Sequence, residues 1–167
     1  SATFNMDDGT AIGYRAAVLT TASEVTAMGS QALASNVTGI HNTAVGYKAS
    51  FGGTGSRNTS LGWAALGAAS SASNVTAIGD EAALVNTASQ IVAVGSQALV
   101  ANTAGTGNTA VGYSSLSGVV LGTGNTAVGH TTSTSSTDVS NTTAVGYQAA
   151  NVNQSSGVTA VGSQALK

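Results

Sequence analysis

The stretch NTAVGY at Asn42–Tyr47 decides the fold, because variants of it recur along the whole chain. An identical copy stands at Asn108–Tyr113, and the near-copies NTAVGH and TTAVGY occupy Asn125–His130 and Thr142–Tyr147. An active site is built once, whereas a short word repeated along a chain is typical of a repeated structural unit. The sequence therefore predicts a repeat architecture.

A glycine that follows an aliphatic residue or methionine marks every copy of the repeat. The ten marker glycines, 16 or 17 residues apart, are Gly13, Gly29, Gly46, Gly62, Gly79, Gly95, Gly112, Gly129, Gly146 and Gly162. Ala stands two places before each of them except at Ser60, and Thr stands three places before except at Val92. Ala also stands three places after, except at Ser115 and Thr132. The copies fill the chain, so we expect a single repeat domain over residues 1–167.

The period of the repeat selects the architecture. Helical repeats need roughly 33 to 47 residues and propeller blades about 40 or more, so both are too long. One coil of a β-solenoid fits, with two strands of about five residues and two turns. We expect an all-β, parallel β-solenoid (a β-roll) of about ten coils. Residues alternate between the two faces of a strand, so Thr and the aliphatic residue share one face, which we expect to be buried, and Ala and Gly share the other. A helix is disfavoured by the many Thr, Val, Gly and Asn residues.

The composition excludes several classes of protein. Charged residues are 6% of the chain, against roughly 25% on average. The net charge of −2 does not favour nucleic acid or anionic lipid, and the absence of Cys rules out disulfides and thiolate metal sites. No apolar run is long enough to insert into a membrane. The chain begins with Ser1 rather than Met, which indicates a segment or processed product of a longer protein.

Three stretches carry a resemblance to a known family: NTAVGYKAS, VTAIGDEAAL and VTAVGSQALK, which begin at Asn42, Val75 and Val158. They resemble the YadA-like head repeats of trimeric autotransporter adhesins. The variant AVGYQAA at Ala144–Ala150 is similar to repeats in phage tail fibres. The resemblance implies a left-handed parallel β-roll with three chains packed side by side. Thin coils also favour a homotrimer independently, because a lone coil would leave an apolar stripe exposed along its length.

Two further columns vary together. In some copies the residue four places before the glycine is small or polar, such as Asn42, and an aromatic ring, such as Tyr47, follows the glycine. In the other copies that residue is aliphatic, such as Val75, and a small or acidic residue, such as Asp80, follows the glycine. We hypothesise that the two columns compensate each other's volume in one packed space.

The candidates for chemistry are few. His130 stands in the aromatic column, which favours a packing role, and His41 precedes a repeat word, where we expect a turn. Neither has a partner at metal-ligand spacing. The acidic residues, expected to be solvated turn residues, are Asp7, Asp8, Glu24, Asp80, Glu81 and Asp138. The runs DDG and GDE could supply oxygen ligands to Ca²⁺ but follow no full calcium-loop pattern.

No catalytic motif is present either. GTGN at Gly105–Asn108 and Gly122–Asn125 superficially suggests a phosphate loop, but neither helix nor Lys follows it. No Gly-x-Ser-x-Gly elbow occurs. We therefore expect no catalytic, cofactor-binding or metal residues, no cofactor and no enzyme activity.

The function expected from these features is mechanical. We expect a structural and adhesive fibre segment on a bacterial or virion surface, an adhesin head or a tail fibre, that attaches to a host receptor or glycan. The loops Ser50–Arg57 and Thr131–Ser140 are the expected contact sites. Self-assembly head to tail into an extracellular filament is an alternative. Ice binding by the Thr column is a further alternative, which the expected burial of that column disfavours.

Overall fold

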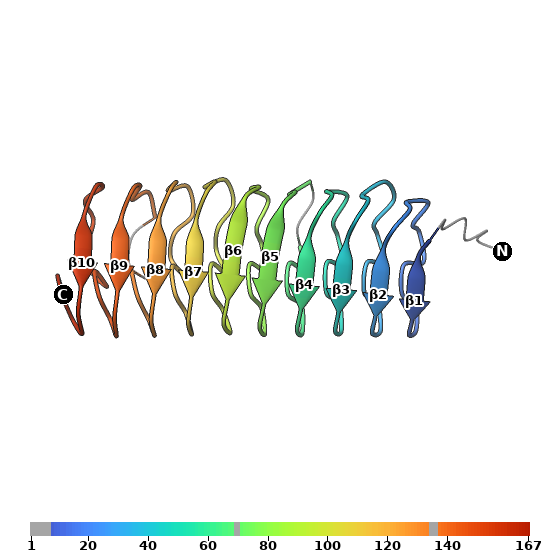
Figure 1. Ribbon diagram of the computed structural model, residues 1–167, viewed down its shortest axis with the longest axis horizontal. Coiled ribbons are helices and arrows are strands. Elements are labelled where there is room, and N and C mark those ends of the chain that lie inside the picture. Colours follow the sequence, from blue (N-terminus) through green and yellow to red (C-terminus); the bar gives the residue numbers. More distant parts are fainter. Residues whose placement is uncertain (1–7, 69–70, 134–136) are drawn as a thin grey trace.

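The protein is a stack of ten short parallel strands. The computed structural model describes residues 8–68, 71–133 and 137–167, and within them every regular element is a strand and none is a helix. The strands are β1 (Thr10–Ile12), β2 (Thr26–Met28), β3 (Thr43–Val45), β4 (Thr59–Leu61), β5 (Val75–Ile78), β6 (Ile91–Val94), β7 (Thr109–Val111), β8 (Thr126–Val128), β9 (Thr143–Val145) and β10 (Thr159–Val161). They form one ten-stranded sheet in chain order, β1 to β10 (Figure 1). The predicted parallel β-solenoid is confirmed.

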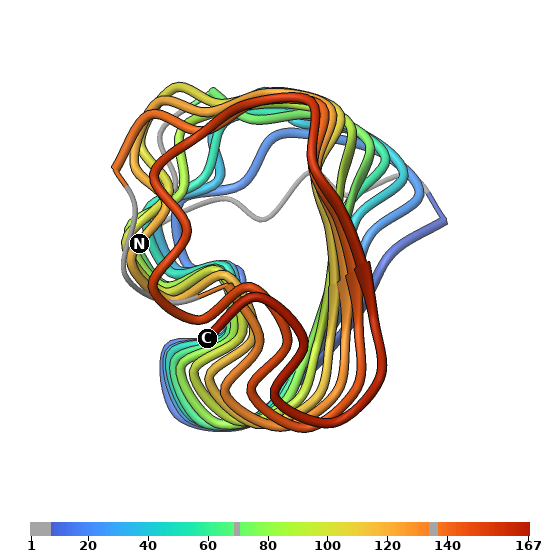
Figure 2. The ribbon, with the colours of Figure 1, turned by 90° about the vertical axis from the view of Figure 1, so that its left-hand side faces the viewer.

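Each strand pairs with the next so that equivalent residues of the repeat lie side by side. Thr43 pairs with Thr59 and Val45 with Leu61, and the same register holds from β1 to β10. Viewed along the axis, the coils lie almost on top of one another (Figure 2). The period of the sequence is thus the length of one turn around the solenoid, and each column of the repeat is a row along its surface or through its interior.

The prediction of two strands per coil was wrong. Each described coil has a single strand of three or four residues, and the rest of the coil is a series of turns. The residues two and four places after the marker glycine have positive φ; in the third coil these are Lys48 (φ 54°) and Ser50 (φ 48°). Such left-handed residues curl the chain where a second strand would extend it. The turns still bond from coil to coil, as when the Lys48 amide donates to the Ser30 carbonyl (3.0 Å).

The interior of the solenoid is built from alanine. The buried alanines of the strands are Ala27, Ala44, Ala77, Ala93, Ala110, Ala127, Ala144 and Ala160. Larger side chains from the turns, such as Leu66 and Leu99, are buried with them in the core. The expectation that the Thr face is buried was therefore wrong. The space inside one coil is narrow, so the small Ala side chain faces inward and the larger Thr and aliphatic side chains face outward.

The marker glycines form a column in which backbone packs on backbone. Gly95 has φ +130°, and a Cβ built on it would lie 2.5 Å from the carbonyl oxygen of Gly112 in the next coil. Eight of the other nine marker glycines, all except Gly162, meet the following marker glycine equally closely. Side chains are excluded from this column both by conformation and by space.

Buried asparagines form a second ladder through the coils. The Asn58 side-chain amide donates to the Ala72 carbonyl (2.8 Å), and its Oδ1 accepts the amide proton of Val75 (3.0 Å). The backbone amide of Asn58 in turn donates to Oδ1 of Asn42 (2.9 Å). Asn108 and Asn125 repeat the pattern farther along the chain. The asparagine side chains therefore satisfy buried backbone groups where the strand pairing ends.

The volume-compensation hypothesis was also wrong. The column four places before the glycine points inward, where Asn42 and Val75 are buried, whereas Tyr47, one place after the glycine, is exposed. The two columns lie on opposite sides of the chain, so they do not fill one space. Nothing in the structure explains why they vary together.

We predict that Gly95→Ala strongly destabilises the stack. The backbone at this position has a conformation that L-residues rarely adopt, and the new methyl group collides with Gly112. We expect the free energy of unfolding to fall by about 3 kcal/mol or more. The control is Gly107→Ala, where φ is +69° and the nearest atom is 3.8 Å away; its expected loss is about 1 kcal/mol. Urea denaturation of both variants measures the difference, and equal losses would contradict the close packing.

We also predict that the asparagine ladder contributes to stability. Asn58→Ala leaves the Ala72 carbonyl and the Val75 amide buried without their side-chain partner, so we expect a loss of about 2–4 kcal/mol. The adjacent Thr59 is exposed, and Thr59→Ala is expected to change stability by less than about 0.5 kcal/mol. Thermal or urea denaturation of the two variants compares them, and an unchanged Asn58→Ala would refute the role of the ladder.

Candidate functional site

The outer face of the sheet carries two parallel rows of side chains. One row consists of Thr10, Thr26, Thr43, Thr59, Thr76, Val92, Thr109, Thr126, Thr143 and Thr159. The other consists of Ile12, Met28, Val45, Leu61, Ile78, Val94, Val111, Val128, Val145 and Val161. Both rows are exposed or half-buried, and neither contains a charged residue. The face is an uncharged strip that repeats the same pair of groups at every strand.

The threonine hydroxyls of this strip have no hydrogen-bond partner among the described residues. Within the described part of the chain, no side-chain hydrogen bond engages the hydroxyl of any of the nine threonines. Hydroxyls elsewhere on the solenoid behave differently: Ser73 Oγ accepts the amide proton of Ser56 (3.0 Å), and Ser140 Oγ accepts that of Thr123 (2.9 Å). The strip therefore presents its hydroxyls, as well as its methyl groups, outward.

Aromatic rings stack beside the strip, one place after the marker glycines. The Tyr47 and Trp63 ring centroids lie 6.1 Å apart, and His130 lies 5.0 Å from Tyr113 and 5.5 Å from Tyr147. These rings come from successive coils, so the row follows directly from the in-register stacking. The predicted packing environment of His130 is consistent with these contacts.

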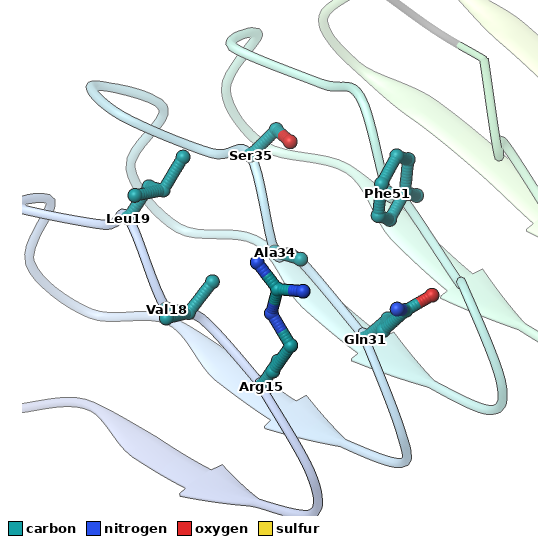
Figure 3. A pocket seen from close by; sticks show the side chains of 7 residues that line it. All are labelled: Arg15, Val18, Leu19, Gln31, Ala34, Ser35 and Phe51. Carbon is teal, nitrogen blue, oxygen red and sulfur yellow. The ribbon is translucent and has the colours of Figure 1, made fainter.

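A groove opens on the turns of the first three coils (Figure 3). Its volume is about 100 Å³, and its lining residues are Arg15, Val18, Leu19, Gln31, Ala34, Ser35 and Phe51. Arg15 extends across it toward Ala34, between Val18 and Gln31 (Figure 3). The groove thus combines a cation and an amide with an apolar lining. Sequence reasoning missed it, because its residues belong to three different copies of the repeat.

The remaining polar candidates are held in surface contacts. His41, which lies on the turn where it was expected, contacts the carboxylate of Glu24 of the preceding coil through Nε2. Glu81 accepts a hydrogen bond from Gln97 (3.0 Å), again one coil away. Both contacts join equivalent positions of neighbouring copies of the repeat. The spacing of the marker glycines could therefore have predicted these two pairs from the sequence. Among the described residues, no three His, Asp or Glu side chains gather where they could hold a metal ion.

The other expected sites are turns. Asp8, Asp80 and Asp138 are exposed, while Asp7 lies outside the described residues. In the GTGN run, the Gly105 amide donates to Asn102 Oδ1 (3.1 Å) and its carbonyl accepts from Asn102 Nδ2 (3.0 Å). A phosphate would have to displace these bonds, so the run is occupied by its own turn.

Of the two loops expected to contact a receptor, Ser50–Arg57 lies largely within the stack. In Ser50–Arg57, the residues Ser50, Gly53 and Gly55 are buried within the stack, and Thr54 and Arg57 are exposed. In Thr131–Ser140, residues 134–136 lie outside the described part, and Thr137 and Asp138 are exposed. The exposed contact area of the first loop is therefore small.

Comparisons with protein-family models, with curated proteins and with solved structures found no match for this chain. In the described residues, no helix has the length and apolar character needed to cross a membrane.

Proposed function

We propose that this chain is a structural and adhesive segment of a homotrimeric fibre, in which three left-handed rolls pack side by side. The fibre belongs to a phage tail or to a bacterial adhesin on the cell surface, and it attaches the particle or cell to a host receptor or glycan. The observation that carries the proposal is the uncharged Thr and aliphatic strip on the outer face of the sheet.

The dimensions of the strip suit an interface. Ten strands about 4.8 Å apart span about 43 Å, and three residues across a strand cover about 10 Å, which gives a projected area of about 430 Å². Contiguous apolar patches of about 300–600 Å² on single chains are often functional. Ile12, Leu61 and Val161 are each about half exposed or more, so association along the strip would remove apolar area from water.

The periodicity of the strip favours a second and third copy as its partners. A partner that contacts every strand must repeat at the same spacing, and another copy of this chain has that spacing by construction. Because the strip is uncharged, copies can approach without burying an unpaired charge. The turns would then remain on the outside of the fibre, where a receptor can reach them.

Ice binding is a second candidate, and the outward orientation of the Thr row favours it. The expected burial of that row was the reason for disfavouring this function, and the row is in fact exposed. Its hydroxyl and methyl groups recur at the regular spacing of the strands, a one-dimensional row that an ordered layer of water could match. The fibre proposal ranks first because the exposed aliphatic row and the aromatic rings beside it offer apolar area to another chain.

We predict that Val128→Lys disrupts the trimer. It places the ammonium groups of three chains in the interface, so we expect the dissociation constant of the trimer to rise at least about ten-fold. The matched control is Thr106→Lys, a change on an exposed turn of the preceding coil, between β6 and β7. Light scattering coupled to size exclusion should give three times the chain mass for wild type and control. A monomeric wild type or an unaffected variant would contradict the proposal, and a mass that grows with concentration would support the filament.

Thermal hysteresis tests the second candidate. If the Thr row binds ice, the wild-type chain should lower the freezing point relative to the melting point, and Thr109→Tyr should reduce the effect by interrupting the array. Thr106→Tyr, on a turn, is the control and should leave it unchanged. Absence of hysteresis in the wild type would eliminate ice binding.

A further inference from the structure

The groove on the first three coils concentrates positive charge on an acidic chain. The chain has a net charge of −2 and only four Lys and Arg residues. One of these four, Arg15, lines the groove. A second, Lys48, lies outside the lining, and its ammonium is 5.3 Å from the ring centroid of Tyr47 and 5.6 Å from that of Phe51, which forms a wall of the groove. No carboxylate is among the lining residues. An anionic ligand would therefore find a local field opposite in sign to the chain as a whole.

The groove also contains an unused hydrogen-bond acceptor. Oε1 of Gln31 is buried and has no hydrogen-bond partner among the described residues. A buried polar atom without a partner is uncommon in folded proteins and costs stability. Gln31 lies beside Arg15 in the lining (Figure 3). Because its Oε1 has almost no exposed surface, the Gln31 side chain has to turn toward the groove before a ligand hydroxyl can reach it. A ligand that brings a hydroxyl group as well as an anion would then meet both side chains.

The rest of the lining is apolar. Val18, Leu19, Ala34 and the Phe51 ring surround the polar groups. An inorganic anion would gain nothing from these side chains, whereas a ligand with a carbon face would pack against them. Nucleic acid is also a poor fit, since its binding requires a longer run of cations than the two found here.

We propose that this groove binds a carboxylate-bearing sugar residue of an acidic polysaccharide. The Arg15 guanidinium pairs with the sugar carboxylate through two parallel N–H bonds, a geometry that suits this planar group. The Gln31 side chain turns toward the groove so that its Oε1 accepts a hydrogen bond from a sugar hydroxyl, and a C–H face of the ring packs on Phe51. This inference names a ligand for the proposed attachment function. It rests on that function only in taking the ligand to be a surface polysaccharide.

The size of the groove indicates how much of the polysaccharide it takes. Pockets that enclose a whole small ligand measure about 300–1,000 Å³, whereas this groove measures about 100 Å³. It therefore holds one sugar residue of a longer chain. Arg15 and Lys48 stand at equivalent positions two coils apart, about 10 Å along the axis, so Lys48 is placed to meet the carboxylate of a further residue of the same polysaccharide.

The experiment compares trigalacturonate with its methyl ester in titrations followed by calorimetry and by amide chemical shifts. We expect saturable binding of the acid with shifts at Arg15, Gln31 and Phe51. We expect the ester to bind about ten-fold more weakly or worse, because it lacks the charge that pairs with Arg15. Arg15→Gln should weaken binding of the acid by a similar factor. Lys167→Gln removes one positive charge from an exposed residue at the other end of the stack and should leave binding unchanged.

Three outcomes would overturn the inference: no saturable binding of trigalacturonate, equal binding of acid and ester, or equal weakening by Arg15→Gln and Lys167→Gln. Competition by sodium sulfate at equal ionic strength as strong as that by trigalacturonate would also overturn it, because it would show a site for anions in general. Circular dichroism verifies that the variants are folded. Light scattering on the same samples reports the trimer separately, so a trimer without sugar binding refutes this inference alone.

Discussion

The stacking of one coil directly on the next at the spacing of paired strands constrains the whole structure. The strand pairing between coils joins equivalent residues, as Thr43 joins Thr59, and the marker glycines likewise meet one another, as Gly95 meets Gly112. A residue is therefore acceptable in a column only if it tolerates a copy of itself, or something similar, about 4.8 Å away. Glycine satisfies this where backbones touch, alanine where the coil is narrow, and asparagine where buried peptide groups need partners.

The features that depend on like-on-like contact were predictable from the sequence. The spacing of the marker glycines predicted the length of a coil, and the repeated Thr-Ala-aliphatic-Gly word predicted both the strands and their parallel order. Which face of each strand lies inside the coil was not predictable in the same way. Alternation places Thr and Ala on opposite faces, but it does not say which face is inside. The width of the coil interior decides that, and this width follows from turns that the sequence does not announce.

The turns escaped prediction because ordinary residues adopt an uncommon conformation in them. Left-handed backbone is normally indicated by Gly or Asn, yet here Lys48, Leu66 and Gln97 adopt it. Coil-to-coil hydrogen bonds, such as that from the Gln97 amide to the Asp80 carbonyl (2.8 Å), offset the local strain. The groove was hidden for a related reason, since Arg15, Gln31 and Phe51 are brought together by stacking and not by any motif. Its neighbouring cations were visible in the sequence but looked scattered.

The in-register stacking also bears on how such a chain changes over generations. Removing or duplicating one whole copy of the repeat, from one marker glycine to the next, leaves every remaining column continuous, because each coil contacts only its neighbours. Recombination between similar copies would thus alter the reach of the rod in steps of a single strand spacing while the Thr and aliphatic rows on the outer face of the sheet stay continuous. Length in this molecule is therefore a heritable variable that can change by whole coils without a change in the register of the sheet.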